Sequence, residues 1–283
     1  METQFKAGQL FTNTALWSRF INETRNAGGY VHREIEKMIL KGEFNILHPI
    51  LHNSNKQNVS FPHSKAKDTY KNFEALADKF RNMTEYERNY PGAKENPGDT
   101  QITINKLLKE GGLSIVDPTE RNNVVLNPLN LLTKRSGKTQ ILVHFIGNCA
   151  YNKPKVQLDH LQHTSQKIIG FETMSKTDLS SCYWQFKIDK KSSDALCFEF
   201  NGIIYRCNGL PYGASCCVWL VQNTNSIICE YFRSKFGTFV LNYIDDFLVQ
   251  HDTNFLADLP EFGLYPNDQF PLIGVEETWL YHQ

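Results

Sequence analysis

The chain has 283 residues, of which 41% are hydrophobic and 21% charged, so it is long enough and apolar enough to bury a sizeable globular core. No apolar run reaches the length of a membrane-spanning helix and the first residues, METQFKAGQL, lack a signal-peptide pattern, so we expect no membrane partner. Seven cysteines without C-x-x-C spacing exclude a disulfide scaffold and a zinc finger, and indicate an intracellular protein of the cytoplasm or nucleus.

The formal net charge of zero conceals an uneven distribution. Residues 1–235 hold all 30 basic side chains and 22 acidic ones, whereas residues 236–283 hold eight acidic side chains and no Lys or Arg. A basic body with an acidic end favours a polyanionic partner, although uneven surface charge alone would give the same counts.

Helices and polar loops are expected in residues 1–95, whose role the sequence does not indicate. Apolar residues recur at helical spacing in YVHREIEKMIL (30–40) and around residues 73–80. The segment NYPGAKENPGDT (89–100) contains two Pro-Gly pairs and predicts a linker, followed by a short amphipathic helix at 104–111.

Residues 124–147, VVLNPLNLLTKRSGKTQILVHFIG, predict a hairpin with a basic turn. Lys134, Arg135 and Lys138 lie at its tip. Two interpretations are open: a finger that contacts phosphate groups, or a turn that only aids solubility.

An acidic residue follows the next predicted strand. In GFETMSKTDLSSCYWQFKID (170–189), a strand over 174–177 leads into Asp178, and a turn or short helix separates it from a second predicted strand at 184–188. Asn201-Gly202 predicts a further hairpin, and a helix is expected from Ser215 to about residue 232.

The stretch LNYIDDFLVQ (241–250) predicts a hairpin with Asp245 and Asp246 at its turn. Strands separated by a packed helix can return to one antiparallel sheet, which would bring Asp178 beside this pair across 67 positions. Three carboxylates there suit two divalent cations and phosphoryl transfer. Taken singly, Asp178 could be a helix cap and the acidic pair a solvated turn.

The YIDD tetrad (243–246) resembles the Tyr-x-Asp-Asp box of reverse transcriptases. KTDLSSCYWQFKI, GLPYGAS and NPLNLLTKRSGKTQILVHF resemble three further blocks of that family, in the family's order over residues 103–250, and the likeness is nearest to retrotransposon polymerases of gypsy-like and tyrosine-recombinase-type elements. The resemblance implies an α+β right-hand fold. Its expected parts are a helical N-terminal region (1–95), fingers (96–170), a palm whose antiparallel sheet is backed by helices (171–260), and a truncated approach to the primer grip (261–283) with the thumb missing.

The resemblance also implies roles for individual residues. Asp178, Leu179, Asp245 and Asp246 are expected to bind two Mg²⁺ or Mn²⁺ ions, with the three aspartates catalytic. The expected nucleotide-binding residues are Lys134, Arg135, Lys138, Tyr183 (as the gate against a 2′-hydroxyl) and Tyr212; those for template or primer are Gln222 and Tyr243. The implied partners are deoxynucleoside triphosphates (dNTPs), an RNA or DNA template with primer, and a protein supplying a thumb or ribonuclease H.

The fingers block departs from the family pattern. Gln140 stands where the family carries an Arg, and Val143-His144-Phe145-Ile146 replaces Val-Asp-x-Arg. Gln lacks the charge and planar fork of Arg, so triphosphate binding should weaken. Two hypotheses therefore stand: an RNA-directed DNA polymerase, or an inactive domesticated remnant that binds nucleic acid or protein. A third, a metal site at His160 and His163 or at His48 and His52, lacks a completing acid or cysteine.

Overall fold

The structure is a computed structural model that describes residues 14–48, 59–60, 69–70, 72–152, 154–158, 168, 173–179, 181–250 and 272–274. The chain divides into two compact units. The first groups Met1–Gln9, Glu43–Pro154 and Tyr183–Cys217, and the second groups Leu10–Gly42, Lys155–Cys182 and Val218–Gln283.

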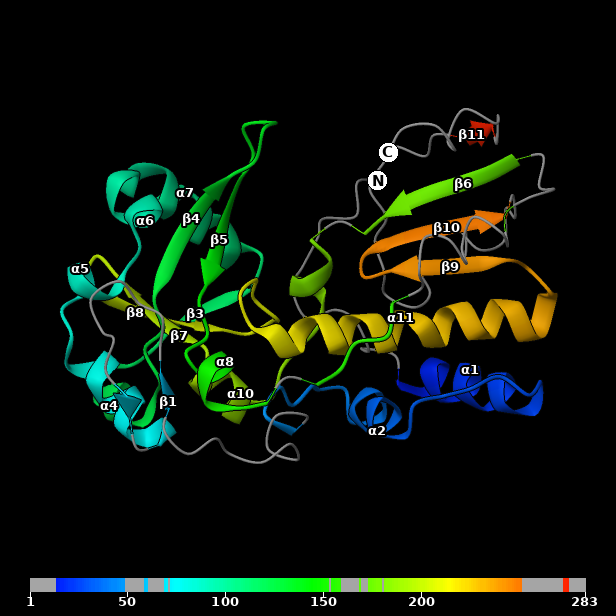
Figure 1. Cartoon of the computed structure of the whole chain (residues 1–283), viewed down its shortest axis with the longest axis horizontal. Helices are drawn as coiled ribbons and strands as arrows, with labels where there is room; N and C mark the ends of the chain where they lie inside the picture. The colour runs from blue at the N-terminus through cyan, green and yellow to red at the C-terminus, as the bar shows by residue number, and fades with distance from the viewer. Residues whose placement is uncertain are drawn as a thin grey trace. The chain divides into compact units, whose positions relative to one another are not determined.

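The second unit has three layers. Its elements are α1 (Thr14–Asn26), α2 (Arg33–Lys41), β6 (Thr173–Asp178), α11 (Ser215–Phe236, of which the first turn belongs to the other unit), β9 (Val240–Tyr243), β10 (Asp246–Gln250) and β11 (Leu272–Gly274). Figure 1 shows the sheet, α11 and the α1–α2 pair as successive layers, with α11 in the middle. The rings of Phe20 and Tyr231, 4.7 Å apart, join α1 to α11.

The sheet of the second unit is antiparallel, with strand order β11-β6-β10-β9. Alternate side chains of β6, β10 and β9 are buried on one face, including Thr177, Phe247 and Asn242, which share one row. The opposite face therefore carries Asp178 and Asp246, because successive side chains of a strand point to opposite faces.

Where the structure describes it, the first unit contains short helices and three small antiparallel sheets. The sheets pair β1 with β2, β4 with β5, and β3 with β8 and β7. The elements are β1 (Val59–Ser60), β2 (Thr69–Tyr70), α4 (Phe73–Asn82), α5 (Glu85–Arg88), α6 (Pro91–Glu95), α7 (Pro97–Lys109), β3 (Leu113–Ile115), η1 (Pro118–Asn123), β4 (Leu129–Thr133), β5 (Thr139–Val143), α8 (Gly147–Ala150), α10 (Lys190–Ala195), β7 (Cys197–Phe200) and β8 (Ile203–Cys207).

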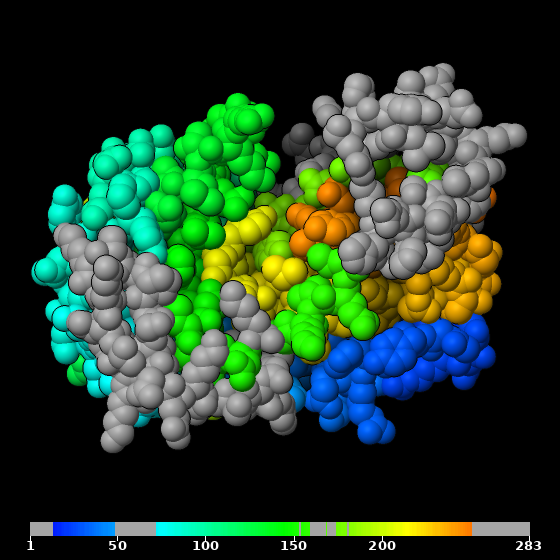
Figure 2. Space-filling model, viewed as in Figure 1, coloured from blue at the N-terminus to red at the C-terminus, as the bar shows by residue number. Residues whose placement is uncertain are grey.

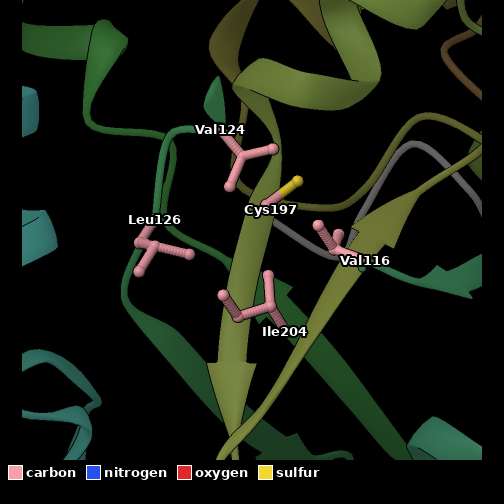
Figure 3. Packing of buried hydrophobic residues seen from close by; sticks show 5 residues of the cluster. All are labelled: Val116, Val124, Leu126, Cys197 and Ile204. Carbon is pink, nitrogen blue, oxygen red and sulfur yellow. The ribbon is translucent and has the colours of Figure 1, made fainter. Parts of the chain in front are cut away.

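A cluster of apolar side chains lies beside the β3-β8-β7 sheet (Figure 3). Its five members, each at most 6% exposed, come from four places in the sequence: Val116, Val124, Leu126, Cys197 and Ile204. Removing this apolar surface from water stabilises the unit and fixes the chain that leads into β4.

Most of the predicted elements are confirmed, but the predicted linker at 89–100 is wrong. Two helices, α6 and α7, occupy it, and Pro91 and Pro97 are their first residues. Proline is favoured at a first helical position because its missing N–H has no partner there in any case. The prolines therefore mark helix starts, and α7 extends the short helix predicted at 104–111.

The strand predicted at 184–188 is also wrong. The 3₁₀-helix η2 (Cys182–Gln185) occupies its first half, and Lys187 and Ile188 make only isolated bridges to Gly209 and Phe44. The Asn201-Gly202 hairpin exists as β7 and β8, but it joins β3 in a separate sheet and not the sheet of Asp178.

Within the residues that the structure describes, no helix is long and apolar enough to cross a membrane.

Candidate functional site

Three acidic residues from distant parts of the sequence meet at one end of the β6-β10-β9 sheet. Asp178, the last residue of β6, is the register partner of Asp246, the first residue of β10. Asp246 is also the partner of Tyr243, so the row Asp178, Asp246, Tyr243 crosses three strands. Directly opposed side chains in such a sheet have Cβ atoms about 4.5–5.5 Å apart. The predicted proximity of Asp178 to the acidic pair is thus confirmed.

Asp245 lies in the two-residue turn between β9 and β10. Its carbonyl oxygen accepts a hydrogen bond from the Leu179 N–H at 3.1 Å, so the turn is tied to the residue after Asp178. The preceding turn residue, Ile244, has a φ of +60°. This conformation is unfavourable for a β-branched residue, and surrounding contacts must hold it.

Two amide side chains of α11 hold the Ile244 peptide. Gln222 Oε1 accepts a hydrogen bond from the Ile244 N–H at 2.7 Å, and Asn225 Nδ2 donates one to the Ile244 carbonyl at 2.8 Å. Gln222 Nε2 also donates to the Asn242 carbonyl at 3.2 Å. Gln222 and Asn225 are three positions apart and lie on one helical face, so a single helix fixes both sides of the strained residue.

The buried thiol of Cys182 lies close to the acidic group. Burial raises the pKa of Cys182 well above its usual range, and the negative charges of Asp245 and Asp178 raise it further, against a hydrogen bond from Asn225. The thiol therefore stays neutral and adds no negative charge to the carboxylates.

Asp246 has a basic neighbour on β6. Lys176 Nζ lies 3.1 Å from Asp246 Oδ1. Among the residues that the structure describes, no three His, Cys, Asp or Glu side chains converge closely enough to hold an ion. The backbone register nevertheless brings Asp178 and Asp246 to the same end of the sheet.

The first unit presents the predicted basic turn. Lys134, Arg135 and Lys138 are exposed at the end of the β4–β5 hairpin, which Figure 2 shows in green, projecting from its unit. Gly137, with a φ of +79°, allows the tight turn.

The Gly-Leu-Pro-Tyr-Gly stretch, residues 209–213, is attached to the end of β5. The Val143 N–H donates to the Tyr212 carbonyl at 2.8 Å, and Asn148 Nδ2 donates to the Gly213 carbonyl at 2.6 Å. Asn148 Oδ1 in turn accepts from the N–H and the hydroxyl of Ser215. The ring of Tyr212 lies 4.8 Å from that of Tyr183, which is 7% exposed.

Residues 123–257 match the family model "Reverse transcriptase (RNA-dependent DNA polymerase)". Over these residues, the chain is similar to the reverse transcriptase family. The matched segment begins before the basic hairpin and extends past the Asp245-Asp246 turn, so it contains all the predicted site residues.

Solved structures agree with the reverse transcriptase fold. One match is a structure titled as the foamy viral protease-reverse transcriptase in complex with double-stranded DNA, at 20% sequence identity and a TM-score of 0.54. The match covers 96% of this chain but only 45% of the solved one. The α+β fold with fingers and palm is thereby confirmed. No curated protein matches the chain.

The reverse transcriptase residues expected from the sequence fall into both units. Asp178, Leu179, Gln222, Tyr243, Asp245 and Asp246 belong to the second, and Lys134, Arg135, Lys138, Tyr183 and Tyr212 to the first. Their individual roles stay predictions. Three residues that the sequence analysis passed over contact the site: Asn225, Asn148 and Lys176. Only Asn225 had a sequence signal, its spacing of three from Gln222.

Two expectations lie outside the described residues. These are the histidine pair His160 and His163, and all of the approach to the primer grip (261–283) except β11. His52 is likewise outside them.

Proposed function

We propose that this chain is a retrotransposon reverse transcriptase, of the gypsy-like or tyrosine-recombinase type, that synthesises DNA from dNTPs on a primed RNA or DNA template inside the cell. One observation carries the proposal: Asp178 is paired in register with Asp246, and Asp245 lies in the adjoining turn. Within a matched reverse transcriptase segment, this pairing unites the two acidic blocks of the family.

The donor set fits divalent cations. Carboxylate oxygens suit Mg²⁺ and Mn²⁺, and Asp178, Asp245, Asp246 and the backbone carbonyl of Leu179 supply only oxygen. Two such ions, when bound, would favour ionisation of the primer 3′-hydroxyl and stabilise the leaving pyrophosphate. The contribution of the chain is to hold the acidic residues on a rigid sheet end and to keep Cys182 neutral beside them.

Residues of the first unit are proposed to bind the nucleotide. Lys134, Arg135 and Lys138 would contact the triphosphate, since Lys and Arg side chains at an exposed tip can reach phosphate oxygens. Tyr212 would contact the nucleotide, and Tyr183 would exclude a 2′-hydroxyl by steric clash. The contact between the rings of Tyr183 and Tyr212 supports the proposal that both tyrosines contact the same nucleotide.

Template and primer are assigned to the second unit. Tyr243 is 55% exposed at the row of acidic residues, and an exposed aromatic ring can stack on a base or sugar. Gln222 is buried and accepts a hydrogen bond from the turn between β9 and β10. We therefore propose that it affects template binding indirectly, by fixing the position of the β9–β10 hairpin. The foamy viral relative was solved with double-stranded DNA, which supports a nucleic-acid partner here. A further protein supplying a thumb or ribonuclease H belongs to the same proposal.

The altered fingers favour a second candidate, an inactive remnant that binds nucleic acid or protein. Gln140 sits on β5 where the family has an Arg, and the ring of His144 stacks on Tyr90 at 5.3 Å. A stacked aromatic pair is a packing contact and supplies no fixed charge for a triphosphate.

Primer extension on poly(rA)/oligo(dT) with Mg²⁺ or Mn²⁺ tests the proposal. The wild type should extend the primer, and Asp245→Asn/Asp246→Asn should abolish extension while keeping the fold. Asp99→Asn, at an exposed aspartate in the first turn of α7, is the matched control and should extend normally. A folded wild type that binds template without extending it would refute the enzyme and leave the remnant.

A further inference from the structure

Lys176 shares a sheet face with the carboxylates. It precedes Asp178 by two residues on β6, and its register partner is Leu248, two residues after Asp246. Side chains two positions apart point to the same face, so Lys176 lies one row from the pair Asp178 and Asp246.

The lysine makes a diagonal ion pair across the two strands. Its Nζ is 3.1 Å from Asp246 Oδ1, and the side chains of Lys176 and Asp246 are 48% and 41% exposed. Diagonal neighbours in an antiparallel sheet are within reach of long side chains. A solvent cation can therefore reach the oxygen that the lysine holds.

A positive charge at this place has a physical reason. Like charges directly opposite each other in a sheet are destabilising, and Asp178 faces Asp246 in register. The ammonium group of Lys176 reduces that repulsion when no other cation is present. A divalent ion would reduce it more strongly, but it draws on the same Oδ1 atom.

We propose that Lys176 is the built-in counter-ion of Asp246 and that divalent metal displaces it. The inference rests on the metal site of the proposed function. It assigns Lys176 a positioning role: the lysine sets the orientation of Asp246 in the metal-free protein and lowers the apparent metal affinity.

The first measurement is Mn²⁺ binding to the full chain, followed by the electron paramagnetic resonance signal of free Mn²⁺. Lys176→Met should tighten binding about two- to five-fold, the range expected for loss of a half-exposed ion pair. Lys176→Arg keeps the charge and should bind like the wild type. Lys37→Met removes a lysine whose ion pair with Glu34 lies on α2, outside the sheet, and should change nothing.

The second measurement needs no metal. In EDTA, Lys176→Met should lower the melting temperature of the wild type but not of Asp246→Asn, because the partner charge is already gone.

The outcomes separate the inference from the proposed function. Equal Mn²⁺ affinity of wild type and Lys176→Met, tighter binding by Lys176→Arg, or no coupling in EDTA would each overturn the counter-ion role while leaving the metal site standing. Coupling in EDTA without Mn²⁺ binding by any variant would overturn both the displacement and the metal site. Tighter binding by Lys176→Met alone, with coupling in EDTA, establishes the role even if primer extension fails.

Discussion

Gly213 shows how a single residue fixes a functional loop. Its φ of +113° lies where L side chains are strained, and a Cβ atom there would lie 2.1 Å from the Val143 carbonyl oxygen. The second glycine of Gly-Leu-Pro-Tyr-Gly is thus required by the close approach of the loop to the end of β5.

Gly213→Ala should destabilise the protein by about 2–4 kcal/mol, because it adds both backbone strain and a collision with a main-chain atom. Urea denaturation measures the change. Gly98→Ala is the matched control: Gly98 is in α7 with nothing within 4 Å of an added Cβ, and the variant should gain up to about 1 kcal/mol. Equal stability of the two variants would contradict the role of the contact.

Asn225→Ala should cost about 1–2 kcal/mol, because the Ile244 carbonyl loses its side-chain donor in a partly buried place. Asn223→Ala removes an amide whose bond, to the Trp219 carbonyl, stays within α11, and should change stability by less than about 0.5 kcal/mol. If the proposed polymerase is active, only Asn225→Ala should also lower kcat, since only it loosens the turn of Asp245.

Among the helices and strands, those whose formation depends on local sequence patterns were predicted correctly from the sequence. The β9–β10 hairpin, the β7–β8 hairpin and α11 follow from alternation, Asn-Gly and helical spacing, and each exists. The linker prediction for 89–100 was wrong because each Pro-Gly pair was interpreted as a loop signal, whereas Pro91 and Pro97 begin helices. The strand prediction for 184–188 was wrong because it relied on the aromatic composition of the segment. Trp184 lies in η2 and Phe186 just after it, and both are buried, so tertiary packing overrides their preference for strands.

The residues of the candidate site likewise fall into those that the sequence predicted and those that it did not. Asp178 and the Asp245-Asp246 pair were found because each lies in a short sequence motif, and because strands separated by a packed helix can return to one antiparallel sheet. Asn148 and Lys176 were missed because their partners, Gly213 and Asp246, are 65 and 70 positions away and no pattern links them. Interactions at that separation depend on tertiary packing, which no local pattern reports.

Three elements of the first unit meet at Glu199 on β7. Arg88, at the end of α5 and fully buried, donates to Glu199 Oε2 at 3.0 Å, and Arg121 of η1 donates to Oε1 at 3.0 Å. Burial alone would raise the pKa of Glu199, but the hydrogen bonds from Arg121 and Arg88 outweigh it and hold the pKa below 4.5. The stabilisation of the folded protein by the bonds of Glu199 to Arg88 and Arg121 is therefore complete above about pH 4.5. It is lost as the pH falls through the lowered pKa of Glu199.

Glu199→Gln should lower the urea midpoint at pH 7 and flatten the decline of that midpoint as the pH falls below the ordinary pKa of a glutamate, because the linked carboxylate is gone. Glu95→Gln, at an exposed glutamate that ends α6, should leave the profile of the wild type unchanged. An acid profile of Glu199→Gln as steep as that of the wild type would place the acid-sensitive group elsewhere.

The whole molecule is electrostatically neutral but segregated, with an excess of eight positive charges before residue 236. If nucleic acid is the partner, its affinity should fall steeply with salt, because neutralised phosphates release counterions. Part of this charge lies at the exposed tip of the β4–β5 hairpin, on Lys134, Arg135 and Lys138.

Replacing Lys134, Arg135 and Lys138 by Ser should reduce the slope of log affinity against log salt by up to about 2–3 on a primer–template duplex. Fluorescence anisotropy at several salt concentrations measures it. Replacing Arg33, Lys37 and Lys41 of α2 by Ser removes the same number of positive charges. This control should reduce the salt dependence of the affinity less than the triple substitution at the hairpin tip does. Identical slopes for both triple variants would show that the tip has no special contact.

The pairing of β6 with β10 also has a consequence during synthesis on the ribosome. Met174 pairs with Gln250, so β6 must wait for 76 further residues before this edge is covered. At about 5–20 residues per second, that interval is about 4–15 s. Throughout it, the strand that carries Asp178 presents unpaired N–H and C=O groups to neighbouring chains, which makes aggregation of the nascent protein most probable in this window. The acidic site is thus completed only after Asp178 has paired with Asp246, 68 positions later in the chain.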